Sequence, residues 1–486
     1  MTSPIWIRRL PALAIAFASA GCSLLASSEI EGTGLGTICK IGTDCHTGLC
    51  EDAICTRECG GASDCPAPMG CFSGRCSYPV SVGAIWSGSL TEDSWSAAHE
   101  AGLQKAGASR PFAAIQTSKS VHRGAVSPIF DGLVEGGVQL IVGDSPTQIG
   151  QMRKKADDYP SVLVLAYGDT STNGRNFSTF QLRTEDGWYV AGTVAARHAT
   201  KRLGAVAGQP SPESVRQLNA FYLGARSVNP AIVLEVRWIG YSVDYSSGPS
   251  FLDKGTKRYY EEFLAAQLLE GGSEVVANMG HNQRVVKLVE SRAQAGNTAA
   301  LSISNISPEG CKGPSGELLH SCLGGVVFQW DSFYGRLLDQ VHRRSWIATP
   351  VNLALTAGSD SVVTYARNTA VDADAASLQD VVGEVSRLDS ERIFTGPYDA
   401  TGQRDPGNTG ATAVAQHVAL GETPSTTEIE GMCWFIKGIV EKVDHEDPHS
   451  EDRDAFVPDA EHPVSAEAFG PPGSPPGVAQ TCRENR

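Results

Sequence analysis

Short apolar runs alternate with stretches of helical spacing from Ser81 onward. The runs are continuous rather than alternating and are rich in Val, Ile, Leu and Ala, which indicates buried strands. They span residues 81–86, 138–143, 161–168, 203–208, 232–239, 274–279 and 299–304. Continuous apolar strands suit parallel sheets that helices cover on both faces, so the pattern predicts an α/β fold with doubly wound sheets.

This pattern continues to about residue 443, which is too much chain for one sheet. We therefore expect two lobes with a cleft between them, and a ligand site beyond the carboxyl ends of the strands. Around this domain, at 79–443, the sequence divides into four further segments. We expect a signal peptide at 1–22, a tether at 23–38, a Cys-rich module at 39–78 and an acidic, Pro-rich tail at 444–486.

The N-terminus has the order of an export signal. Arg8 and Arg9 precede an apolar stretch at 10–17, and small residues then lead to Cys22. This order resembles a bacterial lipoprotein signal, which implies that Cys22 is lipidated and that the protein is held in the cell envelope, outside the cytoplasm. No other run reaches about 18 apolar residues, so we expect the lipid to be the only membrane attachment.

Eight of the 13 cysteines lie between Cys39 and Cys76, in a block with few large apolar side chains. An exported chain of this kind is held together by disulfides, and the spacing suggests two units of four cysteines. Eight cysteines allow 105 pairings, which the sequence leaves open. A zinc site at Cys45, His46 and Cys50 is an alternative that the even cysteine count disfavours.

The other cysteines predict two further bonds. Cys311 and Cys322 are close enough in sequence to close one loop, which leaves Cys433 and Cys482 to hold the tail.

The net charge of −15, from 39 basic and 54 acidic residues, repels nucleic acid. The acidic run at 444–454 could bind a hard metal, but a solvated charge run explains it better.

The chain lacks the GxxxxGK[ST], HExxH and GxSxG motifs, so we expect neither an enzyme nor a cofactor.

Six ordered motifs carry a family resemblance. They are VGAIWSGSLTEDSWSAAHEAG at 82, RTEDGWYVAGTVAAR at 183, ESVRQLNAFYLGARSVNP at 213, WDSFYGRLLDQV at 330, IFTGPYDATGQ at 393 and IEGMCWFIKGIVE at 429. The chain resembles the basic membrane protein family of substrate-binding lipoproteins, which serve nucleoside ABC importers, and especially the branch resembling the Med protein. The resemblance implies a type I periplasmic-binding-protein fold, a small planar ligand such as a purine nucleoside or base, and an ABC permease as partner.

A nucleoside-like ligand needs an aromatic face, hydrogen-bonding groups and close backbone approach. Trp95 begins the first helix and is the preferred stacking residue, with Trp330 in reserve. The other candidates are residues near strand ends or helix starts that would border the cleft: Asp93, His99, Ser145, Tyr167, Arg216, Asn219, Trp238, Asp244 and His281. Asp93 as a helix cap, Trp95 as core and Arg216 as a structural ion pair are the alternatives.

Two departures from the family pattern concern the polar part of the pocket. Gly280-His281-Asn282 follows one strand where the family commonly has an acidic or polar residue, and Asn305-Ile306-Ser307 replaces an Asp-rich turn. A planar heterocycle is then as plausible a ligand as a nucleoside. The competing function is a surface-exposed interaction or sensor lipoprotein that uses the receptor fold as a scaffold, without transport.

Overall fold

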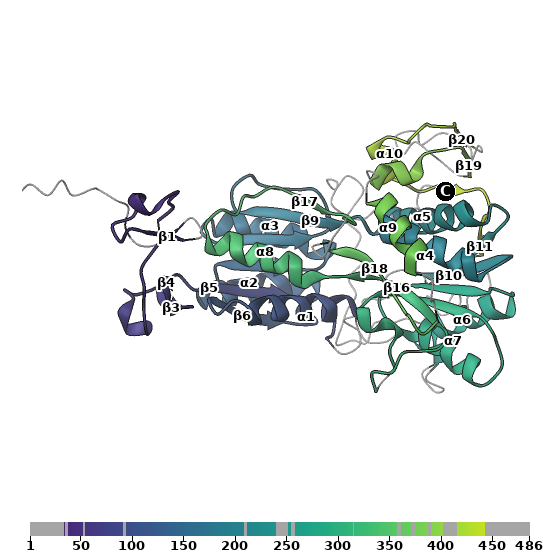
Figure 1. Ribbon diagram of the computed structural model, residues 1–486, viewed down its shortest axis with the longest axis horizontal. Coiled ribbons are helices and arrows are strands. Elements are labelled where there is room, and N and C mark those ends of the chain that lie inside the picture. Colours follow the sequence, from purple (N-terminus) through teal and green to yellow (C-terminus); the bar gives the residue numbers. More distant parts are fainter. Residues whose placement is uncertain are drawn as a thin grey trace, which may run out of the picture.

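Two α/β lobes follow a small N-terminal module in the computed structural model (Figure 1). The structure describes residues 34, 37–51, 54–90, 94–208, 211–239, 251–253, 258–313, 315–356, 361–371, 375–386, 390–401 and 416–442. The predicted signal peptide, most of the tether and the tail lie outside these residues.

The first lobe is built on a six-stranded parallel sheet. Its strand order is β6(Ala113–Ser118), β5(Val80–Ile85), β7(Leu140–Gly143), β8(Leu163–Tyr167), β9(Phe177–Leu182) and β17(Val351–Leu353). Its helices are α1(Ser94–Ala108), α2(Val126–Glu135), α3(Ile149–Asp158) and α8(Trp330–His342). Successive strand residues face opposite sides, so Ile85 packs in the cluster with α2 and α3 while Ala84 packs in the cluster with α1 and α8.

The second lobe repeats this plan with a seven-stranded sheet. Its order is β22(Ile439–Lys442), β11(Val233–Trp238), β10(Arg202–Ala207), β14(Val275–Met279), β15(Leu301–Ile306), β16(Cys322–Phe328) and β18(Val363–Arg367), the last strand being antiparallel. The helices are α4(Thr184–His198), α5(Pro212–Val228), α6(Tyr260–Glu270), α7(Arg284–Gln294) and α9(Ala375–Val385).

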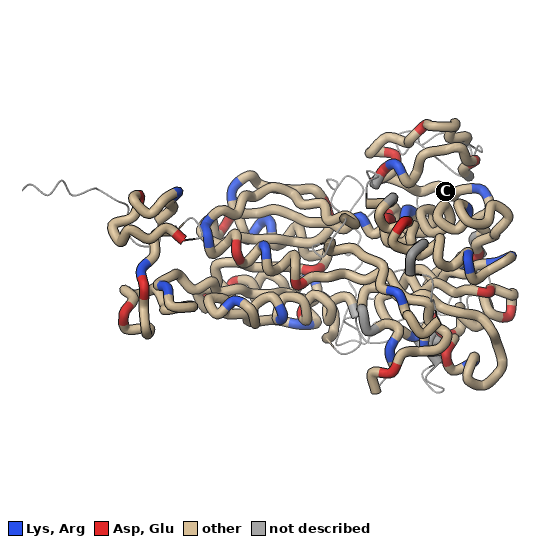
Figure 2. The backbone as a smooth tube through the Cα atoms, in the orientation of Figure 1, with Lys and Arg blue, Asp and Glu red and all other residues tan. Residues whose placement is uncertain are grey.

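Smaller elements complete the second lobe. A sheet of β20(Gln416–Val418), β19(Tyr398–Thr401) and β21(Phe435–Ile436) lies with α10(Thr426–Glu430) beside α5, and β12(Phe251–Asp253) pairs with β13(Arg258–Tyr259). Lys, Arg, Asp and Glu are interspersed along both lobes (Figure 2).

The chain passes from one lobe to the other directly from β9 into α4, from β16 into α8, and again between β17 and β18. In both sheets, the first five strands have the spatial order 2-1-3-4-5. Two such lobes joined by three crossovers form the predicted type I periplasmic-binding-protein fold. The seven predicted strands correspond to β5, β7, β8, β10, β11, β14 and β15, with boundaries shifted by one or two residues.

The module consists of two similar units, each a two-stranded hairpin held by two disulfides. The first unit contains β1(Leu49–Glu51) and β2(Ile54–Thr56), and the second contains β3(Gly70–Phe72) and β4(Arg75–Ser77). In both units the first cysteine pairs with the third and the second with the fourth; the bonds are Cys39–Cys50, Cys45–Cys55, Cys59–Cys71 and Cys65–Cys76. The zinc alternative is wrong, because Cys45 and Cys50 are both disulfide-bonded.

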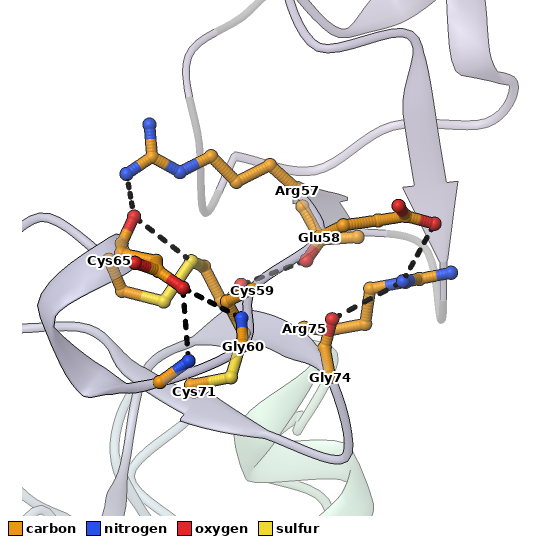
Figure 3. The surroundings of a disulfide bond; sticks show 12 residues. Arg57, Glu58, Cys59, Gly60, Cys65, Cys71, Gly74 and Arg75 are labelled. Atoms are coloured by element: carbon orange, nitrogen blue, oxygen red, sulfur yellow. Dashed lines mark hydrogen bonds and ion pairs between the residues drawn. A yellow bond between two sulfur atoms is a disulfide. The ribbon is translucent and has the colours of Figure 1, made fainter.

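A single Asp in each unit holds the loop between its first two cysteines. Asp44 accepts hydrogen bonds from the backbone N–H groups of Lys40 and Ile41, and Asp64 accepts them from Gly60 and Gly61. Figure 3 shows the second unit, where Arg75 donates to Glu58 and to the carbonyl oxygen of Gly74. The repeated spacing in the sequence is therefore a structural duplication.

The expected bond between Cys311 and Cys322 is confirmed. Cys433 is also disulfide-bonded, and Cys482 lies outside the described residues. Its pairing with Cys482 stays a prediction.

Close helix packing in the second lobe depends on two glycines. A Cβ on Gly192 of α4 would collide with the backbone of Phe221, and one on Gly224 of α5 would collide with the backbone of Tyr189.

We expect Gly192→Ala to lower the free energy of unfolding by about 1–3 kcal/mol, because the helices must separate. Gly132→Ala is the control, since a Cβ there meets no atom within 4 Å. It should stabilise α2 by up to about 1 kcal/mol. Urea unfolding measures both, and equal effects would contradict the packing argument.

The ionised Glu274 carboxylate should contribute stability that is lost in acid. Burial acts to raise the pKa of this carboxyl, but hydrogen bonds from the N–H groups of Lys201, Arg202 and Thr200 and from the Thr200 hydroxyl outweigh it and lower the pKa to about 2. The ionised form therefore stabilises the fold above the unfolded pKa, and this contribution is lost as the pH falls toward 2.

We expect Glu274→Gln to lower the urea midpoint at pH 7, and the difference from wild type to shrink between pH 5 and pH 3. Glu270→Gln is the matched control, because the Glu270 side chain is 70% exposed and lies 3.7 Å from Arg292. Its effect should be near zero throughout. A Glu274→Gln effect that is constant with pH would contradict the assignment.

Candidate functional site

The carboxyl ends of both sheets face the space between the lobes, because the chain leaves β9 and β16 at those ends to enter the other lobe. In a 2-1-3-4-5 sheet, ligands bind where the strand order reverses, outside the ends of the first and third strands. These are β5 and β7 in the first lobe, and β10 and β14 in the second. The candidate site lies where these four strand ends meet.

Trp95 stands at the centre of this region, in the first turn of α1. Its indole N–H donates to the carbonyl oxygen of Asp144, directly after β7, over 2.8 Å. Its ring contacts Tyr167 from the first lobe, with centroids 4.8 Å apart, and His281 and Phe328 from the second, at 6.0 and 5.8 Å. Only 8% of Trp95 is exposed. It is therefore both core and part of the interlobe surface.

Asp144, which the sequence analysis did not select, fixes the first-lobe side. Its carboxylate accepts from the backbone N–H of Ser87 over 2.8 Å and from the hydroxyl of Ser96. Ser96 in turn accepts from the N–H of Gly88. The loop after β5, the end of β7 and the start of α1 are thus tied together. The sequence signal for Asp144 is its place directly after the apolar run 138–143.

Ser145, the neighbouring candidate, has a local structural role. Its hydroxyl accepts from the N–H of Thr147 and caps the short turn at Pro146–Gln148. It is partly exposed at the end of β7.

His99 and Trp330 form the floor beneath Trp95. Their rings stack with centroids 3.8 Å apart, and the Trp95 ring meets them at 4.6 and 5.6 Å. His99 Nδ1 is 2.6 Å from the hydroxyl of Tyr334, and burial lowers the pKa of His99 well below its usual value. The imidazole is therefore neutral, and the floor is aromatic and uncharged.

His281 forms the opposing wall, from the loop after β14. Its ring lies nearly parallel to Trp95, with an angle of 22° between the planes. Hydrogen bonds on both sides hold this loop. Asn278 Oδ1 accepts from the Gly280 N–H, and Asn282 donates to Glu261 and accepts from the N–H of Arg284.

The two sequence departures lie together behind His281. The Asn305 side chain donates to the carbonyl oxygen of Gly280 over 3.3 Å, and Gln283 donates to the carbonyl oxygen of Asn305 over 2.9 Å. These amides bind backbone groups of the loop. They give this side of the site structural hydrogen bonds where the family resemblance implied carboxylates.

A polar contact joins the lobes beside the rings. The hydroxyl of Tyr167, the last residue of β8, donates to Glu213 Oε1 over 3.2 Å. Glu213 lies in the first turn of α5, which begins at Pro212 after the Ser211 cap. Burial raises the pKa of the Glu213 carboxyl, while the nearby Arg216 guanidinium opposes the rise. Glu213 was not among the predicted site residues, although it lies at a helix start five residues after the apolar run 203–208.

The structure places Arg216 within a buried ion cluster. Its Nε lies 3.6 Å from Glu185 Oε1, its Nη1 donates to the carbonyl oxygen of Glu430, and Glu185 also lies 2.7 Å from Arg183. These contacts favour the structural alternative for Arg216.

Two more candidates lie away from Trp95. Asn219 is fully buried, donates to the carbonyl oxygen of Trp434 and accepts from the N–H of Ile436, so its amide holds the 432–436 segment. Trp238, at the end of β11, contacts Phe435 with ring centroids 6.4 Å apart. Asp93, Asp244 and Cys22 lie outside the described residues.

Residues 79–257 match the family model described as ABC transporter substrate-binding protein PnrA-like, or Bmp. A putative ABC transporter glucose-binding protein of Haloferax volcanii is 25% identical over 271 residues, 55% of this chain and 63% of that protein. A purine-binding protein of Brucella abortus is 22% identical over 312 residues, 64% of this chain and 78% of that protein.

Among solved structures, an ABC transporter solute-binding protein from Conexibacter woesei is similar at 18% identity and a TM-score of 0.49, covering 63% of this chain and 95% of that one. A transcriptional activator of the comK gene from Bacillus halodurans is similar at 16% identity and a TM-score of 0.49, covering 65% and 98%.

No helix within the described residues is long and apolar enough to cross a membrane. The two-lobed topology and the match over its first half agree with the six sequence motifs. Residues 79–257 are therefore similar to the Bmp, or PnrA-like, family of ABC transporter substrate-binding proteins, whose members are solute-binding proteins.

Proposed function

We propose that this protein is a lipid-anchored receptor outside the cytoplasm that captures a purine nucleoside or a purine-like base for an ABC importer. The observation that carries the proposal is the pair of rings, one from each lobe, at the two points where strand order reverses. Trp95 and His281 face each other with centroids 6.0 Å apart and nearly parallel planes.

This separation suits capture of a flat ligand by lobe closure. Two stacking contacts of about 3.5 Å each need a gap of about 7 Å, which a small opening of the lobes would provide. A planar ring inserted there would contact both lobes at once and thereby stabilise the closed form. Stacking is tolerant of the ring's identity, so the polar groups at its edge must provide selectivity.

The purine assignment rests on three supports. The two rings lie nearly parallel across the lobes, residues 79–257 match the PnrA-like family of substrate-binding proteins, and the Brucella relative is named a purine-binding protein. Glucose, in the name of the Haloferax relative, is the appropriate competing ligand in a binding test. The attachment and the permease rest on the N-terminal signal pattern and on the family.

We expect Trp95→Ala to weaken binding of the preferred purine by about 2–4 kcal/mol, some 30- to 1,000-fold, because stacking and apolar burial are both lost. Calorimetry with adenine, adenosine, guanosine, inosine and glucose measures this. The variant will also lose stability, since Trp95 packs in the core.

Trp434→Ala is the matched control for that loss. Trp434 is also buried, 1% exposed against 8% for Trp95, but it packs near Tyr398. The affinity of the Trp434→Ala variant should therefore equal that of wild type at a temperature where both variants are folded. Absence of purine binding in wild type, or equal affinities of the Trp95 and Trp434 variants, overturns the purine proposal and favours the scaffold function.

Because we propose that a lipid on Cys22 anchors the protein, we expect Cys22→Ala to leave it unprocessed or released from the membrane. The substitution removes the acceptor thiol for the lipid. Membrane fractionation with mass spectrometry of the N-terminal peptide measures this outcome. Cys482→Ala should remain lipid-bearing and membrane-associated. A Cys22→Ala protein that still carries a lipid at its N-terminus would refute the anchor.

A further inference from the structure

Glu213 lies where a bound ligand's edge would meet the second lobe. Its hydrogen bond to Tyr167 crosses between the lobes, and the Tyr167 ring packs edge-on against Trp95 with centroids 4.8 Å apart. Burial raises the pKa of the Glu213 carboxyl, and Arg216 and His281 are among the neighbours that oppose the rise. Glu213 therefore adjoins both rings that would sandwich the ligand.

The hydrogen bonds of Glu213 are few and long. Tyr167 and Gln217 both donate to Oε1, over 3.2 and 3.3 Å. A carboxylate can accept about four hydrogen bonds, and those recorded within the described part of the chain leave Oε2 without a donor. Glu213 is partly exposed, so a ligand N–H could reach this oxygen and form a charge-assisted bond.

Three other charged groups have their recorded contacts within a single lobe, whereas the Tyr167–Glu213 bond crosses between the lobes. Arg216 is committed to Glu185 and to the carbonyl oxygen of Glu430. Asp144 has its carboxylate bonded to Ser87 and Ser96. Glu261 accepts from Asn282 within the loop that carries His281.

Resting on the proposed function, we propose that Glu213 determines specificity by accepting hydrogen bonds from the exocyclic amino group of a purine held between Trp95 and His281. The ligand class is accordingly an aminopurine, free or as its nucleoside. The Tyr167 hydroxyl donates to Oε1 of the same carboxylate, which leaves Oε2 for the ligand.

Two ligand pairs that differ only in an amino group test this proposal: adenosine against purine riboside, and guanosine against inosine. We expect wild type to bind at least one amino-bearing member about tenfold or more tightly than its partner, since an unmatched buried carboxylate penalises the partner. Glu213→Gln should abolish that preference. Calorimetry measures the four affinities for each variant.

Tyr167→Phe tests whether Glu213 contacts the ligand or acts only as a latch, that is, through the Tyr167–Glu213 hydrogen bond between the lobes. It removes the Tyr167–Glu213 bond but leaves the carboxylate, so the amino preference should persist. If Glu213 acts only through the latch, both variants change all four affinities by the same factor, which overturns the inference.

The failures of the two proposals are distinguishable. Wild type that binds purines without any amino preference overturns the role of Glu213 and leaves the purine receptor standing. Wild type that binds none of the four ligands overturns the proposed function and this inference with it. The wild-type measurements decide both points even if a variant does not fold.

Discussion

The packing of Trp95 against rings from both lobes is the contact on which the interlobe geometry depends. The main hydrophobic core runs without interruption from the strands of the first lobe, through Trp95, Trp330 and Phe328, into the strands of the second. Aromatic rings are large and rigid, so they define the distance and angle between two surfaces better than flexible side chains do. The two lobes therefore meet over a defined aromatic surface.

Hydrogen bonds around this surface serve mainly to orient the rings. Asp144 ties the Trp95 end of α1 to the first sheet, and Asn278 and Asn282 shape the loop that presents His281. Because such bonds are strong in a region of low dielectric, they fix the walls without contacting a ligand themselves. Glu213 lies at the edge of this surface, where Tyr167 and Gln217 donate to its Oε1.

The Cys-rich module is separated from this chemistry by the direction of the strands. β5 begins at Val80, directly after the module, and its carboxyl end points to the other lobe, so the module lies at the far end of the first lobe (Figure 1). Its residues provide little apolar area, and four disulfides replace the missing core. Arg344 lies over the ring of Tyr78, 4.6 Å from its centroid, and holds the module against the lobe. The module and the candidate site thus lie at opposite ends of the first lobe.

Local pattern accounts for much of the fold. Continuous apolar runs gave seven strands, because a strand covered on both faces needs apolar residues at every position. β6 and β9 were missed because Gln116, Thr117, Ser178 and Thr179 interrupt the apolar pattern; β6 is an edge strand, and β9 buries polar side chains that the rest of the chain must satisfy. The cysteine loop at 311–322 and the duplicated module could be recognised because their partners lie close in sequence.

Sequence position alone identified Trp95, Tyr167 and His281 as residues near strand ends or a helix start, since the carboxyl ends of parallel strands share one edge. Which of the candidates meet was decided only by the tertiary structure. It brought Trp95 of α1 against His281 of the other lobe, withdrew Arg216 into an ion cluster with Glu185, committed Asn219 to the 432–436 segment, and joined Glu213 to Tyr167. These contacts link residues far apart in the chain, and no local propensity specifies them. They depend on how the two lobes pack across their shared aromatic core.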